Sequence, residues 1–484
     1  MSTAPSVTDR PRRGRRPAAQ LVGIALAYFM VLLDTTVLAV AEPSIMISLH
    51  TGVAGVGWAT TAYTTALASA LVLGGGLADR LGAYPVFVVG VVGFGAASVA
   101  CALSPALAYL LVFRALLGLF AAAIIPSSLA LIAALYPDPG ARGRAISAWA
   151  AISGAAMAAG PVVGGWLIAV DDWHAVFVIN APTALAVLVL CRTPITTTRR
   201  LRALSWLPHL GLAATLTTGT LAITRAGHRS WPEAVLFGLV ALGLAYGTAA
   251  VDRTSSAPLV PASLRRDRAV WTAFAWGAAV NYALTTVLFS VPLLLHATAT
   301  AAGATLLPMT LLVALNPPAT GRLVAAHGPL RPIRMGFVAF PVGLALVAAG
   351  TAAHGRPLVL GLGLLLCGLG VSWTLPALVG FAVQHAAPDA AGSVGGILNA
   401  TRQAGATVAA AVAGAVLTQD RGSGTAAVPF LIAAAVCALG LAGATTRHLS
   451  RTKEAPVADH VAEARHLGHM SRTSDGSSGE LPGD

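Results

Sequence analysis

One acidic residue, Asp34, lies deep within a long apolar run near the start of the chain. A carboxylate inside a membrane is costly, so an intramembrane acid is by default a functional site that needs a partner. Arg114 is a candidate partner, because at 1.5 Å per helical residue Asp34 and Arg114 lie about 13 Å and about 12 Å from the outer ends of their runs. A proton or a cationic substrate would compete with Arg114 for Asp34. A purely structural ion pair is the alternative.

Other polar and aromatic residues within apolar runs are candidates for lining a cavity. They are Tyr63, Trp149, Asn281, Tyr282, Asn399, Arg402 and Gln403. Aromatic rings can contact a flat or cationic substrate, but they also pack between helices, and membrane amides commonly join helices by hydrogen bonds. Glu42, near the outer end of the first run, either attracts cations in an outer vestibule or is simply solvated.

The composition indicates the elements that carry these residues. Hydrophobic residues make up 56% of the chain and charged residues 10%, against about 25% charged in soluble domains. Fourteen apolar runs are long enough to span a membrane, which takes roughly 20 residues. They begin near Ala19, Val56, Tyr84, Ala106, Arg144, Ala175, Trp206, Trp231, Ala269, Ala302, Pro332, Pro357, Ser393 and Ala426. The sequence therefore predicts an all-α polytopic membrane protein.

The arginines predict its orientation. The net charge of +12 comes from arginines in the N-terminal tail and in the even-numbered gaps between runs. By the positive-inside rule this places both termini in the cytoplasm, and placement in short gaps argues against nucleic-acid binding. We expect a multi-pass protein of the cytoplasmic membrane. The first run contains Asp34 and is too long for a signal-peptide core, so we expect it to be retained.

The chain also contains an internal repeat of one short motif. Gly75 to Gly82 closes the second run, and Gly321 to Gly328 closes a later one with the same Gly-x-Leu-x-x-x-x-Gly spacing. A duplication in a membrane protein usually builds two half-bundles around a central path, which indicates a secondary transporter. The four cysteines show no metal or redox spacing and are expected to pack.

The motifs carry a resemblance that runs from about Ala19 to Arg447. The chain resembles the major facilitator superfamily, and most closely its fourteen-helix drug:proton antiporters. The matching motifs, in order, are Leu33-Asp34-Thr35-Thr36-Val37 with Pro43, Gly75 to Gly82, Arg114 with Gly118, Gly160-Pro161-Val162-Val163-Gly164-Gly165, Trp173 with Phe177, Asn180 and Pro182, and Asn399-Ala400-Thr401-Arg402-Gln403-Ala404-Gly405.

The resemblance implies a major facilitator fold with six-helix halves at residues 19–192 and 269–448. A linker at 193–268 would hold inserted helices seven and eight, between a basic tail at 1–18 and a disordered tail at 449–484. Asp34 would bind the proton or cation and Arg114 would tune its proton affinity. The gating loop would comprise Gly75, Asp79, Arg80 and Gly82, and the bend that limits proton leak would comprise Gly160, Pro161, Gly164 and Gly165.

The sequence departs from the family pattern at several of these motifs. Ala83 and Tyr84 stand where the loop signature usually ends in two basic residues, which weakens any charge relay there. Leu117 replaces a usual Gln, and Ala39 a usual Asn. Glu42 replaces a usual apolar residue.

We therefore expect a proton-coupled exporter of amphipathic drug-like or antibiotic compounds that works by alternating access. It would be a monomer without cofactor or metal, driven by the proton gradient. A dedicated exporter of one endogenous metabolite is the alternative. A polytopic membrane enzyme is more remote, because His385 and Asp389 are the nearest approach to a polar cluster at one membrane face.

Overall fold

The computed structural model describes residues 15–197, 205–256, 258–260, 262, 264–265, 267–295, 299–352, 356–385, 391–418 and 426–445. Both predicted tails lie largely outside these residues, as does Asp389. Within the described residues the chain forms sixteen helices and no strand. It divides into a compact unit, Met1–Leu441, and a second unit, Ala442–Asp484.

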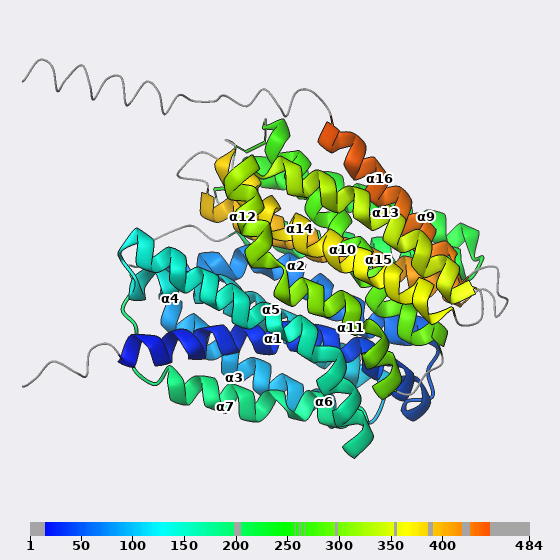
Figure 1. The fold of residues 1–484 in the computed structure, drawn as a ribbon, viewed down its shortest axis with the longest axis horizontal. Coiled ribbons are helices and arrows are strands. Elements are labelled where there is room, and N and C mark those ends of the chain that lie inside the picture. The colour runs from blue at the N-terminus through cyan, green and yellow to red at the C-terminus, as the bar shows by residue number, and fades with distance from the viewer. Residues whose placement is uncertain are drawn as a thin grey trace, which may run out of the picture. The chain divides into compact units, whose positions relative to one another are not determined.

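The helices run side by side with their axes nearly aligned (Figure 1). The first group is α1 (Arg15–Ser48), α2 (Val53–Leu81), α3 (Ala83–Ala102), α4 (Leu107–Leu135), α5 (Pro139–Asp171), α6 (His174–Val178) and α7 (Asn180–Leu190). Next come α8 (Trp206–Gly227) and α9 (Trp231–Thr254). The last group is α10 (Arg268–Leu295), α11 (Ala299–Leu315), α12 (Pro317–His327), α13 (Leu330–Ala352), α14 (Pro357–Gln384), α15 (Ala391–Leu417) and α16 (Val428–Thr445). The fourteen predicted runs thus fall on sixteen helices, because the sixth and tenth runs are each broken in two.

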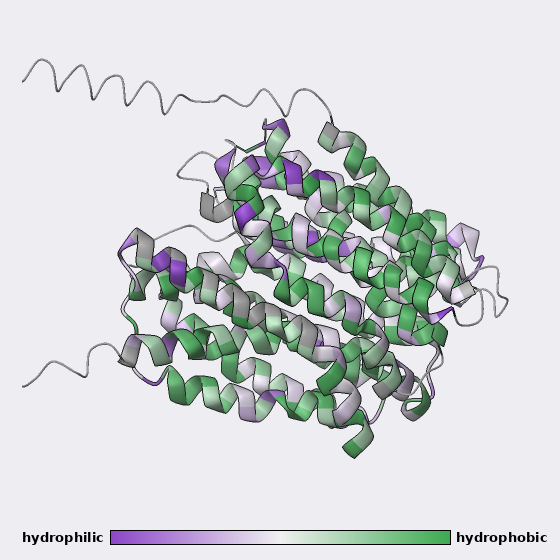
Figure 2. Ribbon diagram, in the orientation of Figure 1, coloured by the Kyte–Doolittle hydropathy of each residue, from purple (hydrophilic) through white to green (hydrophobic). Residues whose placement is uncertain are grey.

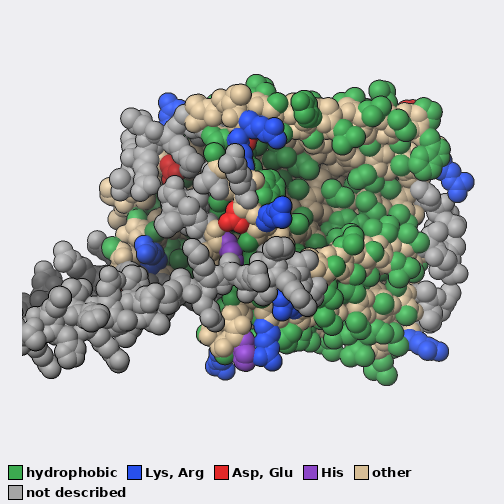
Figure 3. Space-filling model, turned by 90° about the horizontal axis from the view of Figure 1, so that it is seen from above, with side chains coloured by type: hydrophobic (Ala, Val, Ile, Leu, Met, Phe, Trp, Pro, Cys, Tyr) green, Lys and Arg blue, Asp and Glu red, His purple; other side chains and the backbone are tan. Residues whose placement is uncertain are grey.

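The apolar helices make this a polytopic membrane protein. Eight described helices are long and apolar enough to span a bilayer, and the pair α11 and α12, bent by 46°, would make a ninth. A span count of fourteen stays a prediction for the other runs. Hydrophobic residues are frequent along the helices (Figure 2). In Figure 3 a broad hydrophobic face has Lys and Arg side chains toward its two ends.

Helix packing repeats between the two groups. In the first group α1 packs on α5, α2 on α4, and α3 on α4; in the last group the equivalent helices pair as α10 on α15, α11 on α14, and α13 on α14. The two largest contacts between the groups match each other, α2 against α15 and α5 against α11. This is the arrangement expected when duplicated half-bundles face each other about a pseudo-two-fold axis.

The echoed loop signature has the same backbone geometry in both copies. Gly82, after α2, has a φ of 98°, and Gly328, after α12, has a φ of 73°. No other described glycine has a positive φ. Because side chains disfavour this conformation, glycine ends both helices and turns the chain into the next one.

The inserted helices lie beside the first and last groups. α8 packs on α2 and α15, and also on α9. α9 is hardly buried, with large exposed residues such as Leu242 and Tyr246. Exposed apolar side chains of this kind suit a lipid-facing helix.

Glycines let several helices approach closely, and Gly118 shows the constraint most clearly. A Cβ on Gly118 would overlap the carbonyl oxygen of Tyr63 on α2. Gly380 on α14, in contrast, has no atom within 4 Å of a built Cβ. The contact between α2 and α4 therefore depends on glycine at position 118, whereas α14 does not need glycine at 380.

Gly118→Ala should lower the thermal unfolding temperature of the purified protein, because overpacking costs about 1–3 kcal/mol. Gly380→Ala is the matched control, since both substitutions gain the same helix propensity, about 1 kcal/mol. Thermal unfolding in detergent measures the difference. Equal unfolding temperatures for the two variants would contradict the packing argument.

Candidate functional site

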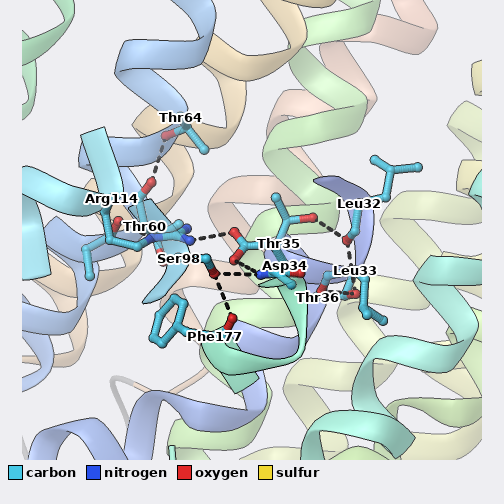
Figure 4. Close-up of polar contacts among 12 residues, drawn as sticks. Leu32, Leu33, Asp34, Thr35, Thr36, Thr60, Thr64, Ser98, Arg114 and Phe177 are labelled. Atoms are coloured by element: carbon cyan, nitrogen blue, oxygen red, sulfur yellow. Dashed lines mark hydrogen bonds and ion pairs between the residues drawn. The ribbon is translucent and has the colours of Figure 1, made fainter. Parts of the chain in front are cut away.

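The structure brings Asp34 of α1 and Arg114 of α4 into direct contact. Nη1 of Arg114 lies 2.5 Å from Oδ2 of Asp34, and the residues are 1% and 3% exposed, respectively. Figure 4 shows the two side chains meeting across the space between their helices. The equal depths counted along the sequence thus correspond to a buried, charge-assisted hydrogen bond.

A second layer of polar groups holds the acid from the side of α7. Asn180, the first residue of α7, reaches Oδ1 of Asp34 with Nδ2 at 3.4 Å and donates to Oγ of Ser98 at 2.8 Å. Ser98 in turn donates to the carbonyl oxygen of Phe177 at 2.9 Å. That carbonyl lies at the break between α6 and α7, where it also accepts a backbone N–H bond, so the hydrogen-bond chain from Asp34 ends at the break.

The arginine is fixed from the side of α2. Nε of Arg114 donates to the carbonyl oxygen of Ala59 at 3.3 Å, and the guanidinium carbon lies 4.5 Å from the ring centroid of Tyr63. The close approach at Gly118, one turn along α4, brings this part of α2 against Arg114. A cation over an aromatic face is stabilised by about 0.5–2 kcal/mol.

A small cavity lies on the other side of Arg114, between the two helix groups. Its volume is about 100 Å³, and its lining includes Arg114, Tyr63, Thr35 and Tyr28, but not Asp34. In this conformation Arg114 lines the cavity, whereas its partner Asp34 does not. Ligand pockets usually enclose about 300–1,000 Å³, so the helix groups must move apart to admit a drug-sized molecule.

Glu42 is buried at the same cavity, two helical turns beyond Asp34 on α1. It is 1% exposed, Oγ1 of Thr60 donates to its Oε1 at 3.4 Å, and its Oε2 has no hydrogen-bond partner among the described residues. The expectation of a solvated acid near the interface is wrong here, because α2 and the last helix group cover this end of α1. Asp34 is thus not the only acid buried within the apolar runs.

Four other predicted lining residues lie on the cavity wall that faces α1, and they form one polar cluster. They are Asn281 of α10 with Asn399, Arg402 and Gln403 of α15. Nε of Arg402 donates to Oδ1 of Asn281 at 3.2 Å, and Nη1 donates to Oδ1 of Asn399 at 3.1 Å.

Two of the predicted lining residues do not line this cavity. Trp149 of α5 stacks on Tyr28, with ring centroids 4.5 Å apart, so that Tyr28 lines the cavity and Trp149 lies behind it. Tyr282 follows Asn281 on α10 and is also absent from the lining. Successive residues of a helix point about 100° apart, and here Asn281 faces the cavity whereas Tyr282 is turned away from it.

The gating-loop residues lie at the junction of α2 and α3. Asp79 is partly buried and Arg80 exposed, and neither makes an ion pair with another described residue. The arginines at 199, 200 and 202 fall outside the described residues. Positions 83 and 84, where the family usually has basic residues, make hydrogen bonds instead of ion pairs. The backbone amide of Ala83 donates to Oγ1 of Thr197, and the hydroxyl of Tyr84 donates to the carbonyl oxygen of Cys191.

The predicted bend on α5, at Gly160, Pro161, Gly164 and Gly165, contacts both helix groups. A Cβ on Gly160 would overlap Thr36 of α1, and one on Gly164 would lie 3.0 Å from Val37. On the other side, Gly303 of α11 packs against the carbonyl of Pro161, while Gly165 is buried on α5. The motif therefore seals α5 tightly against α1 in one group and α11 in the other.

Sequence reasoning missed two participants in the site, Asn180 and Ser98, which contact Asp34 directly or through one bond. Tyr63 lines the cavity as predicted, and its ring also covers Arg114. The signal for Asn180 was present, as a lone amide between Phe177 and Pro182 in an apolar run. Ser98 has no such signal, because serines are common in membrane helices.

Repeated half-bundles around a buried ion pair and a central cavity define a membrane transporter, not an enzyme. A family model described as Major Facilitator Superfamily matches residues 24–410 and 295–472. The chain belongs to the major facilitator superfamily.

Curated relatives are resistance and export proteins. The chain is 31% identical over 418 residues to the tetracenomycin C resistance and export protein of Streptomyces glaucescens, covering 84% of this chain and 77% of that one. It is 30% identical to the methylenomycin A resistance protein of Streptomyces coelicolor, covering 89% and 93%. It is also 30% identical to the multidrug resistance protein Stp of Mycobacterium tuberculosis, covering 82% and 75%.

Solved structures share the fold at low sequence identity. A POT family transporter in complex with 5-aminolevulinic acid matches with a TM-score of 0.65 at 14% identity, covering 88% of this chain and 96% of that one. The xylose transporter XylE from E. coli, in a partially occluded inward open conformation, matches with a TM-score of 0.62 at 12% identity, covering 88% and 98%.

Asp34→Asn should destabilise the protein by about 3–5 kcal/mol, because it leaves Arg114 buried without a counter-ion. Adding Arg114→Met removes the stranded charge, so the double variant should unfold at a higher temperature than Asp34→Asn alone. The measurement is a double-mutant cycle of thermal unfolding in detergent. Additive losses would show that the two residues do not act as a pair.

Proposed function

We propose that this protein exports amphipathic drug-like or antibiotic compounds across the cytoplasmic membrane in exchange for protons. The observation that carries the proposal is the buried Asp34–Arg114 pair beside the central cavity. Intramembrane acids paired with one basic residue are typical of proton relays in transporters. The relatives named for resistance to tetracenomycin C and methylenomycin A support a substrate of antibiotic type.

Coupling follows from the charge balance of the pair. A proton that reaches Asp34 from the outside neutralises the carboxylate and leaves Arg114 without its counter-ion. The attraction that holds α1 against α4 within the first helix group is then lost, so that group can repack and change its contacts with the last group. Release of the proton toward the cytoplasm restores the pair, so each cycle moves a proton inward as substrate moves outward.

The contacts between the helix groups can alternate in such a cycle. Oγ1 of Thr407 on α15 donates to Oγ1 of Thr64 on α2 at 2.7 Å, and α5 meets α11 at Pro161 and Gly303. These contacts hold the two helix groups together in the present conformation. Rocking of one half against the other would break one set while keeping the other, as alternating access requires.

The distribution of arginines supports an orientation with both termini in the cytoplasm. Arg80, Arg144 and Arg192 are exposed at the end of the bundle where α1 begins. Positive residues of this kind stay on the cytoplasmic side during insertion. We propose a monomer that needs no cofactor and uses the proton gradient as its energy source.

A dedicated exporter of one endogenous metabolite is the second candidate. The cavity of about 100 Å³ favours it in one respect, since a tightly closing site suits a narrow substrate range. Neighbouring genes for synthesis of an antibiotic would favour this form of the function, and their absence would favour broad efflux.

In inverted vesicles that express the native protein, an inside-acid pH gradient should drive uptake of rhodamine B, an amphipathic dye. Asp34→Asn should reduce the uptake to the level of vesicles without the protein, because it cannot exchange a proton at that site. Asp171→Asn, at the exposed last residue of α5, is the matched control and should keep the uptake. Gradient-driven uptake by Asp34→Asn at equal expression would contradict coupling through Asp34.

Glu42 is proposed as a second proton-accepting group on the outer side of Asp34. Residues 34, 38 and 42 follow one face of α1, and the cavity lining includes Leu38 and Glu42. A carboxyl buried with only a hydroxyl partner is less costly when neutral than when charged. Glu42 can therefore hold a proton in the closed state and pass it along α1 when water enters.

Glu42→Gln should weaken the response of uptake to the pH gradient while dye exchange without a gradient continues, because only proton delivery is lost. Glu233→Gln is the control, since Glu233 is exposed and pairs with Arg225 at 2.9 Å, and surface pairs contribute little. Vesicle uptake at several imposed gradients measures the effect. An unchanged gradient dependence would remove Glu42 from the proton path.

A further inference from the structure

Arg402 is a half-buried arginine that has no acidic partner among the described residues. It lies on α15 in the wall of the central cavity, opposite α1, and its hydrogen bonds go only to the amide oxygens of Asn281 and Asn399. None of the ion pairs among the described residues includes it. Arg114, on the same cavity, has a carboxylate partner. The two arginines thus line one cavity, but the charge of Arg114 is neutralised by a carboxylate and the charge of Arg402 is not neutralised by any described residue.

The chemistry of arginine fixes the orientation of the two amides. A guanidinium only donates hydrogen bonds, so Asn281 and Asn399 must turn their oxygens toward Arg402. Each Nδ2 group therefore points away from the guanidinium, and neither donates to another described residue. With Gln403 beside them, this wall presents N–H donors to the cavity. Donor groups without acceptors match a ligand that supplies acceptors.

Tight packing between α10 and α15 holds the cluster in place. A Cβ on Gly277, one turn before Asn281, would lie 3.1 Å from Cγ of Arg402, and one on Gly405 would overlap the backbone of Ala278. The arginine stem and the Asn281 side chain are therefore confined between two closely spaced helices. A preorganised donor site binds an anion without losing much side-chain entropy.

An aromatic platform lies within reach of the same cluster. Tyr28 and Arg402 line the same cavity, and Trp149 holds Tyr28 in a stack with an interplanar angle of 9°. A flat ring placed against Tyr28 would bring its substituents near the donors. This pairs an apolar surface with a site for negative charge.

We propose that Arg402, Asn281 and Asn399 form a recognition site for the anionic group of an aromatic substrate, a carboxylate or a phenolate. The inference rests on the proposed export function and names the substrate class that the cavity selects. An unpaired cation inside a membrane protein needs a partner, and here the substrate supplies it. Lipophilic cations without an acidic group should bind poorly.

The test compares rhodamine B with its ethyl ester, which differ only in whether the carboxylate is free. The full chain in lipid nanodiscs should bind the free carboxylate more tightly than the ester by about tenfold or more, as expected for a charge-assisted hydrogen bond. Fluorescence anisotropy, corrected with empty nanodiscs, measures both affinities.

Arg402→Gln should remove the preference for the carboxylate, and Arg402→Lys should keep part of it. Arg356→Gln, at an exposed position before α14, is the charge-matched control and should keep all of it. Thermal unfolding of each variant shows whether it is folded. No binding of rhodamine B by the native protein, or an equal preference in native and Arg402→Gln proteins, would overturn the proposal.

Vesicle uptake separates this proposal from the export function. If vesicles with the native protein take up both dyes equally and vesicles with Asp34→Asn take up neither, anion recognition by Arg402 is rejected and proton-coupled export is supported. Native vesicles that take up neither dye under a gradient would reject proton-coupled export of these dyes. Binding that requires Arg402 would then still support the recognition site.

Discussion

The arrangement of the N-terminal helices depends on the cost of burying an acid and a base in an apolar bundle. Asp34 and Arg114 must meet each other, because neither has water to solvate it. The glycine at 118, the broken sixth run and the stack of Tyr63 on Arg114 all serve that contact. A pair held this firmly is stable until a proton arrives, and this makes it suited to control a larger movement.

The central cavity has different electrostatics on its two sides. The first helix group contributes a neutralised pair and a buried carboxyl, whereas the last group contributes an arginine with only amide partners. If the first helix group binds protons and the last helix group binds substrate, the proton and the substrate occupy separate sites along one path. The substrate then need not compete with the proton for Asp34, and the two are exchanged because both sites open and close with the same movement of the halves.

Much of the fold could be predicted from the sequence, because apolar run length and glycine spacing are local properties. The repeated loop motif predicted two equivalent turns, and Gly82 and Gly328 both have the positive φ that such turns require. Burial was harder to predict. Glu42 looked peripheral by position along its run, but neighbouring helices cover it, and Trp149 is screened by Tyr28. Such outcomes depend on contacts between distant segments, which one sequence does not display.

The most direct test of the central claim is the distance between the halves as a function of pH. Spin labels at Arg144 on α5 and Arg322 on α12 would lie at exposed positions of opposite halves, while the four native cysteines are buried. The account predicts that acidification shifts the distance distribution in the native protein, and that Asp34→Asn shows the acidic distribution at every pH. An Asp34→Asn variant that follows the same titration as the native protein would contradict it.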